Sequence, residues 1–315
     1  LNTTDILIND TSVNLTAYPQ NATDVDGDSV KTIYNWLRNG VPIAVLNMPF
    51  EGINNTASNN AWDYSGLGNN GSENNGVLWN ATGGYDRKGA YQFDGIDDFI
   101  NIPDNNHLDF GTGNFSFGLW FKTPGVMGVQ PDYRLIAHRS GITGYELLIN
   151  GAGNPLGTFL GDGTSTTSPN ACTSTNIGSN NWQHAVVVIN RGTKTWKTYL
   201  NGSLCSTIDI SIVTGSIANG ASLNLGRYSD LAIRFFNGTM DEVTFWNRSL
   251  SAEQVLALYN NRTDLIVSQE TAVGEVWSAQ VTPNDGFVDG NMSQSNNVTI
   301  LDNSIPAVTI VNPTN

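Results

Sequence analysis

The sequence predicts an all-β protein with one short helix, and the spacing of its strands and turns supports this fold class. Residues 186–189 form a short apolar run, and residues 194–200 alternate before Asn201-Gly202, a strong signal for a hairpin turn. Clusters of Gly and Asn separate such runs along the 315-residue chain. This spacing is typical of β-sandwiches and jelly rolls.

The two ends of the chain each contain part of a second, smaller sandwich. Residues 33–40 form a short strand after the Asp- and Gly-rich turn at 24–29, and residues 274–286 form another strand that ends in a turn. Neither piece contains enough strands to bury a core by itself. We therefore predict that the two pieces pair with each other; the alternative is two small independent modules.

This pairing predicts one domain inserted into a loop of another. The split sandwich comprises residues 1–47 plus 265–302, and the inserted domain comprises residues 48–262. Residues 303–315 are expected to form a linker and a terminal strand. The apolar run at 307–311 either starts the next tandem domain or completes a sheet of the next subunit in a filament.

Two segments of the inserted domain differ from the strand-and-turn pattern. One short helix is predicted near 251–260, because Ser251 can cap the run that follows and an acidic residue lies in its first turn. Residues 54–84 are rich in Asn and Gly and are expected to form a long loop. Such a loop is either functional or folded back over the sandwich by its aromatic residues, which are Trp62, Tyr64 and Trp79.

The composition excludes several classes of partner. The chain has 28 Asp and Glu residues against 14 Lys and Arg residues, which gives a formal net charge of -14. A negative surface without a basic run argues against nucleic acid or an anionic membrane as partner. No apolar run of about 18 residues is present, so no membrane insertion of this segment is expected. The polar start predicts no signal peptide here, and we expect a longer parent polypeptide.

Two features favour an exported protein. Cys172 and Cys205 are expected to form a disulfide in an exported protein, whereas in a cytosolic protein they would be ordinary buried thiols. Asn-x-Ser/Thr patterns, the acceptors for N-glycosylation, are more frequent than the high Asn content alone would produce. They lie at Asn2, Asn9, Asn14, Asn21, Asn54, Asn70, Asn80, Asn114, Asn201, Asn237, Asn247, Asn261, Asn291 and Asn297.

A series of motifs runs through residues 48–262. They are DYSG at 63–66, GAYQFDGIDDFI at 89–100, FSFGLWFK at 115–122, WQHAV at 182–186, YLNG at 199–202 and NGTMDEVTFWNRSLS at 237–251. In their order and spacing these motifs resemble the laminin G-like, concanavalin A-like jelly-roll family in its bacterial and archaeal form. The flanking pieces resemble an immunoglobulin-like module of prokaryotic surface proteins. The resemblance therefore implies a concanavalin A-like jelly roll inserted in a split immunoglobulin-like sandwich.

The family resemblance also implies a structural calcium ion at Asp94, Gly95 and Asp241, where the first and last strands of the jelly roll meet. Carboxylate and carbonyl oxygens are the ligands that calcium prefers, and a Gly lets its carbonyl point inward. The alternative is that Asp94 only builds a turn and that Asp241 is a solvated acid. A second acidic cluster is interpreted as a plain Asp-Gly turn, and its members are Asp24, Asp26 and Asp28.

We predict no enzymatic activity. Related jelly-roll glycosidases carry two carboxylates on one strand that face the same cleft. Here the close acidic pairs are Asp97-Asp98 and Asp241-Glu242, and neighbours on a strand point to opposite faces. No Gly-x-Ser-x-Gly motif and no zinc-type spacing of His and Cys is present. His184 in the WQHAV motif is interpreted as a structural histidine.

The resemblance implies carbohydrate binding as the commonest activity of the family, with exposed aromatic rings stacked on sugars. Four aromatic residues near Gly-rich turns are candidates, although such residues also form cores: Trp62, Tyr133, Tyr145 and Tyr228. We predict a non-catalytic, extracellular segment of an archaeal or bacterial cell-surface or filament protein that presents its jelly roll to glycans, neighbouring subunits or tandem domains. The alternative is a calcium-dependent, lectin-like module of a larger adhesin or secreted glycan-active enzyme.

Overall fold

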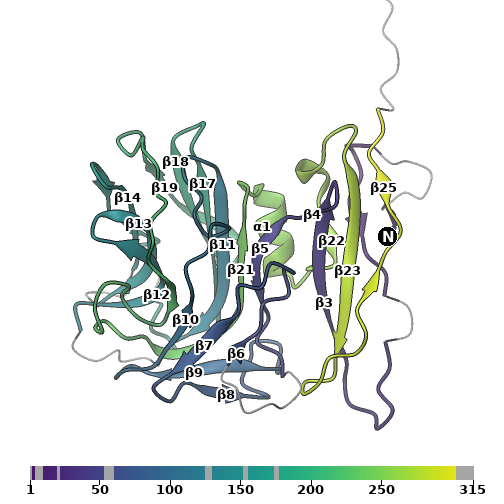
Figure 1. The fold of residues 1–315 in the computed structure, drawn as a ribbon, viewed down its shortest axis with the longest axis horizontal. Coiled ribbons are helices and arrows are strands. Elements are labelled where there is room, and N and C mark those ends of the chain that lie inside the picture. Colours follow the sequence, from purple (N-terminus) through teal and green to yellow (C-terminus); the bar gives the residue numbers. More distant parts are fainter. Residues whose placement is uncertain are drawn as a thin grey trace, which may run out of the picture.

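The computed structural model describes residues 2–3, 10–19, 22–52, 60–124, 130–151, 155–173 and 177–302, which form four antiparallel sheets. Two large sheets pack face to face as a jelly roll, and two small sheets form a second sandwich beside it (Figure 1). Among the described residues, no helix is long and apolar enough to span a membrane.

The first large sheet has nine strands. Its order is β15 (Thr166–Thr167), β14 (Leu156–Asp162), β13 (Thr143–Asn150), β12 (Asp132–Ser140), β20 (Leu223–Leu225), β10 (Phe99–Ile102), β7 (Gly71–Asn74) and β6 (Asn60–Ala61), and β16 (Asn170–Ala171) pairs with β14.

The second large sheet has eight strands. Its order is β19 (Ser203–Asp209), β18 (Thr195–Leu200), β17 (Gln183–Asn190), β11 (Phe115–Lys122), β21 (Asn237–Trp246), β9 (Ala90–Asp94) and β8 (Leu78–Asn80), and β5 (Ala44–Met48) pairs with β21. The two large sheets enclose one hydrophobic core. Phe117 on β11 and Tyr145 on β13 meet across it with ring centroids 5.7 Å apart. The all-β jelly-roll prediction is therefore confirmed.

The smaller sandwich joins segments from both ends of the described chain. Its five-stranded sheet contains β24 (Ser293–Gln294), β23 (Val276–Asn284), β3 (Lys31–Arg38), β4 (Val41–Pro42) and β25 (Val298–Thr299). Its three-stranded sheet contains β1 (Asn2–Thr3), β2 (Leu15–Thr16) and β22 (Leu265–Ile266).

Strands β3 and β23 pair over their whole length, from Lys31 opposite Asn284 to Arg38 opposite Trp277. The rings of Trp36 and Trp277 meet edge to face at 6.5 Å in the core of this sandwich, which also contains Leu15 and Ile266 from the other sheet. This burial compensates for the few strands that each piece contributes. The immunoglobulin-like identity of this sandwich and the domain boundaries stay predictions.

The predicted helix is present as α1 (Ala252–Tyr259), and a short 3₁₀ turn, η1 (Ser268–Glu270), follows β22. The Ser251 hydroxyl accepts a hydrogen bond from the Gln254 backbone N–H at 3.1 Å, as expected for an N-cap. Val255 is fully buried among Val186 and Trp246 on the outer face of the eight-stranded sheet. The helix therefore covers that face of the jelly roll.

The segment at 54–84 was expected to be a long loop; residues 54–59 lie outside the described residues, and residues 60–84 contain strands. Residues 60–84 contribute the short strands β6, β7 and β8 to the edges of the two large sheets. The Asp63 carboxylate organises this segment by accepting hydrogen bonds from the backbone N–H groups of Asn47, Ser65 and Asn69. The sequence prediction failed because such short strands gain most of their stability from pairing with β9 and β10.

A disulfide joins Cys172 to Cys205, as predicted, and closes a loop with a sequence separation of 33. Reducing it is expected to lower the free energy of unfolding by about 3 kcal/mol, because the reduced unfolded chain gains conformational entropy. Urea unfolding of oxidised and of reduced, alkylated protein measures this difference. Alkylating reagent without reductant is the control, and equal stability of the two forms would contradict the prediction.

Candidate functional site

The outer faces of the two large sheets have different surroundings. The helix α1 and the smaller sandwich lie against the eight-stranded sheet. The nine-stranded sheet lies on the opposite side of the jelly roll (Figure 1), and no helix or sheet of the described residues packs on its outer face. We call this surface the open face; it carries Ser72, Asn101, Ala137, Arg139 and Asn224.

A row of small polar side chains crosses the middle of the open face. Asn101 on β10 lies directly opposite Ser72 on β7 and opposite Asn224 on β20. The Asn101 amide donates a hydrogen bond to the Asn224 side-chain oxygen at 3.0 Å. Ser72 is exposed, Asn101 is half-buried and Asn224 is buried. The row therefore exposes the Ser72 hydroxyl and part of the Asn101 amide, while the buried Asn224 holds Asn101 in place.

Three arginines surround the ring of Tyr228 at one side of this row. The guanidinium carbon atoms of Arg134, Arg139 and Arg234 lie 5.1, 5.4 and 5.5 Å from the ring centroid. Arg134 and Arg234 both pair with Asp132, the latter at 2.9 Å. Since Tyr228 is half-buried by these contacts, burial raises the pKa of its hydroxyl.

Glu146 is the carboxylate at the centre of this group, and both of its oxygens are occupied. Its Oε1 accepts from Arg134 Nε at 3.1 Å, and its Oε2 accepts from Arg139 Nη1 at 3.0 Å. The residue is fully buried, and burial raises the pKa of its carboxyl against the opposing effect of the two arginines. This carboxylate serves the ion-pair network and is not aimed at a ligand.

Arg227 differs from the other arginines of the open face. Its guanidinium carbon lies 3.9 Å from the ring centroid of Phe99, and its buried Nε has no hydrogen-bond partner among the described residues. The nearest ion pairs of the face involve Arg134, Arg139 and Arg234 instead. Burial lowers the pKa of the Arg227 guanidinium, and no carboxylate offsets that effect.

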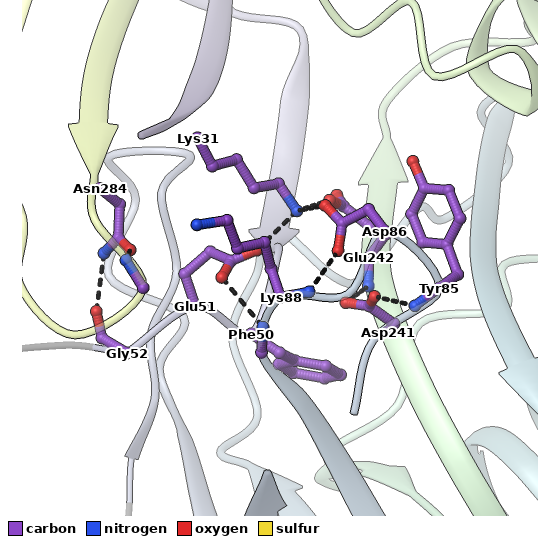
Figure 2. Close-up of polar contacts among 12 residues, drawn as sticks. Lys31, Phe50, Glu51, Gly52, Tyr85, Asp86, Lys88, Asp241, Glu242 and Asn284 are labelled. Carbon is purple, nitrogen blue, oxygen red and sulfur yellow. Dashed lines mark hydrogen bonds and ion pairs between the residues drawn. The ribbon is translucent and has the colours of Figure 1, made fainter. Parts of the chain in front are cut away.

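A second polar group joins the two sandwiches; Figure 2 shows it, and we call it the Lys31 cluster. The Lys31 ammonium on β3 lies 2.6 Å from Glu51 Oε1 and 2.8 Å from Asp86 Oδ2, and it also pairs with Glu242 on β21. The fully buried Asp241 adds a fourth carboxylate nearby. Burial raises the pKa values of the Glu51, Asp241 and Glu242 carboxyls, and the Lys31 ammonium opposes this. The cluster thus ties the sandwich to the jelly roll.

Comparison with known proteins identifies the family. The family model of the concanavalin A-like lectin/glucanases superfamily matches residues 94–256. The chain belongs to this superfamily. No curated protein matches it significantly.

Several solved structures are similar to this superfamily member. One is the binding domain of Paraclostridial Mosquitocidal Protein 1, with 18% identity over 69% of this chain and 52% of that chain, at a TM-score of 0.55. Another is the receptor binding domain of botulinum neurotoxin C/D mosaic serotype, with 16% identity over 70% and 51%, at 0.55. A third is the binding domain of botulinum neurotoxin DC in complex with rat synaptotagmin II, with 17% identity over 70% and 52%, at 0.55. The chain spans about half their length, and the likeness concerns the fold.

The calcium ligands that the superfamily resemblance implied do not lie in one place. Asp94 is opposite Asn237 at the start of β21, and its Oδ1 accepts the backbone N–H of Ile96 at 2.7 Å. The Gly95 carbonyl accepts from the Gln130 amide at 3.2 Å. Asp241 lies further along β21 beside Lys31. The three residues therefore do not form a common set of oxygen ligands, and the Lys31 ammonium lies among the carboxylates around Asp241. Binding of a structural calcium ion by this superfamily member stays a prediction.

Two of the four predicted stacking residues are part of the core. Tyr133 and Tyr145 are 2% and 0% exposed, so they cannot stack on a sugar, and the prediction for them is wrong. Tyr145 points inward because it alternates with Glu146, and its hydroxyl donates to the Leu108 carbonyl at 3.2 Å. Trp62 is 43% exposed beside β6, and Tyr228 lies on the open face. These two remain candidates.

The remaining predicted positions have varied surroundings. Among the sequons, Asn247, Asn291 and Asn297 are exposed, as are Asn114 and Asn261 although their side-chain oxygens accept hydrogen bonds. The half-buried ones are Asn14, Asn70, Asn80, Asn201 and Asn237, and the side chains of Asn2, Asn9, Asn21 and Asn54 lie outside the described residues.

The terminal strand predicted within 303–315 also lies outside the described residues. The Asp24 carboxylate accepts from the Asp26 and Gly27 backbone N–H groups, as in an Asp-Gly turn.

Sequence reasoning missed the arginines of the open face. Simple alternation places Arg134 and Arg139 on opposite faces of one strand, and only the register shift between Arg134 and Ile136 brings both of them to the face of Glu146. In TGYELLIN, by contrast, Glu146 lies between the apolar Tyr145 and Leu147, so alternation alone marked it as facing outward. Arg227 carried no such signal, because it follows the strand β20 at a turn.

Proposed function

We propose that this chain is a non-catalytic binding module of an extracellular structural or adhesive protein, with the open face as its ligand contact. The observation that supports this most directly is the state of Glu146, the central carboxylate of the face, whose two oxygens are both engaged by arginines. A glycosidase needs two carboxyl groups free to face the scissile bond. The face instead offers amides, a hydroxyl and guanidinium groups, which bind without reacting.

The close acidic pairs of the sequence support the same conclusion. Asp98 accepts the Asp94 backbone N–H at 2.9 Å and so holds the turn after β9. Asp241 and Glu242 belong to the Lys31 cluster on the other large sheet. Neither pair lies in the open face, so neither supplies a general acid and a nucleophile to a ligand bound there.

The similar structures favour a binding role in a larger protein. Their titles describe binding or receptor binding domains, one of them in complex with synaptotagmin II. Extracellular display agrees with the Cys172–Cys205 disulfide, which persists in oxidising surroundings. In our proposal the smaller sandwich contacts neighbouring units of the same surface protein or filament, and the Lys31 cluster fixes the jelly roll on it.

A glycan array combined with mass spectrometry tests the proposal. We expect the purified chain to retain a subset of glycans, with and without EDTA, and to leave the retained glycans uncleaved after prolonged incubation. The variant Trp62→Ala is expected to weaken retention, because it removes an exposed ring beside the open face. Cleavage products would contradict the non-catalytic role, and an array without any retained glycan would leave protein contacts as the only binding role to pursue.

A further inference from the structure

We propose that the open face binds glycans that carry a carboxylate, and that Arg227 is the residue that pairs with this group. The inference rests on the proposed binding function and names its ligand class. Four of the nine arginines of this acidic chain lie on or beside the open face: Arg134, Arg139, Arg227 and Arg234. Three of them are paired with Asp132 or Glu146, so Arg227 is the arginine of this face whose charge is left to attract an anionic ligand.

Arg227 has the properties of an ionic anchor that lacks its partner. Arg134 is paired with Glu146 and Asp132, Arg139 is paired with Glu146, and Arg234 is paired with Asp132. Among the described residues, the Arg227 guanidinium makes no ion pair or hydrogen bond. A partly buried charge without a partner costs free energy, which a bound carboxylate would recover.

The position of the Arg227 guanidinium is held by Phe99. A stacked guanidinium loses less conformational freedom on binding than a free one, and its planar fork matches both oxygens of a carboxylate. Because Phe99 is two residues from Asn101 on β10, the anchor lies on the same face as the polar row. Arg227 itself follows Asn224 by three residues.

The polar row provides the other contacts that a sugar needs. Ser72 and Asn101 lie opposite each other on neighbouring strands, so a ring placed over them meets a hydroxyl and an amide, and the buried Asn224 holds the Asn101 amide in place. Trp62, 43% exposed, follows the edge strand β6 of the same sheet. An acidic oligosaccharide of several rings that lies across the strands would place its carboxylate at Arg227 and a more distant ring toward Trp62.

The test compares acidic and neutral glycans on one array. The probes are glycans ending in sialic acid, uronic acid oligosaccharides, sulfated oligosaccharides and their neutral counterparts. We expect carboxylated glycans to be retained preferentially and their binding to weaken as the ionic strength rises. The variant Arg227→Gln is expected to lower affinity for them by about tenfold or more, since a charge-assisted bidentate contact is lost.

The control variant is Arg87→Gln, which removes the same charge from an exposed arginine in the turn between β8 and β9. It is expected to bind like the wild type. The variant Arg227→Lys keeps the positive charge but lacks the planar guanidinium that can bind both carboxylate oxygens, so it should recover binding only in part. Circular dichroism verifies that each variant is folded.

Four results would overturn the inference. Equal retention of neutral and carboxylated glycans, or unchanged affinity of Arg227→Gln, would exclude the carboxylate anchor while leaving glycan binding intact. Retention of sulfated glycans alone would exclude the carboxylate in favour of another anion. An array without any retained glycan would overturn both this inference and the glycan-binding part of the proposed function.

Discussion

Replacing Lys31 by methionine is expected to lower the free energy of unfolding by about 3 to 5 kcal/mol. Methionine preserves the length and apolar packing of the side chain but removes the ammonium that lies between Glu51, Asp86 and Glu242. Those carboxylates are largely buried between the two sandwiches, so their charges would remain without compensation. Urea unfolding followed by circular dichroism measures the loss.

The loss caused by Lys31→Met should depend on pH. The carboxyls of Glu51, Asp241 and Glu242 have raised pKa values in the folded protein, so the native state binds protons more readily than the unfolded state. Their contribution to stability is therefore greatest at low pH and is lost as the pH rises through the raised pKa values. Without Lys31 these pKa values rise further. Near pH 5 more of these carboxyls are therefore protonated and uncharged in the variant. We expect the loss of unfolding free energy relative to wild type to be larger near pH 8 than near pH 5.

The control for this prediction is Lys194→Met, which removes a lysine from an exposed turn before β18. It should change the free energy of unfolding by less than about 0.5 kcal/mol. A Lys31→Met protein as stable as this control at both pH values would show that the cluster does not join the sandwiches.

Replacing Trp277 by alanine is expected to destabilise the smaller sandwich by about 3 to 5 kcal/mol. Trp277 is fully buried, it packs against Trp36, and its indole N–H donates to Glu275 Oε2 at 3.0 Å. The substitution removes much of a core that contains few other large side chains. Denaturant unfolding followed by tryptophan fluorescence measures the loss of stability. Amide hydrogen exchange shows which strands lose protection.

The exchange pattern distinguishes a split sandwich from a set of separate pieces. Amides of β3 and β23 should lose protection together in Trp277→Ala, because the two strands pair along their whole length. Amides of β11 and β17 in the jelly roll should change much less. Trp62→Ala is the matched control, since it removes an exposed indole. Loss of protection in β23 alone would contradict the pairing.

The open face and the Lys31 cluster show where sequence reasoning failed. Alternation correctly separates the two faces of a regular strand, but Glu242 has a positive φ of 53°, next to a register shift between β11 and β21. At this irregularity the expectation that neighbouring acids point to opposite faces was wrong, because Asp241 and Glu242 both act on Lys31. A bulge of this kind leaves no mark in the hydrophobic pattern.

The sequence by itself determined the fold class, the single helix, the disulfide and the family, because these depend on local patterns: alternation, turn residues, a helix cap and the order of motifs. It also placed the strands that pair from opposite ends, since neither can bury its apolar side alone. Only the tertiary structure decided that Tyr145 lies in the core, that Lys31 meets carboxylates from the jelly roll, and that Arg227 lacks an acidic partner. Those facts depend on which side chains from distant strands become neighbours, and such neighbours are set by sheet order and register rather than by any local pattern.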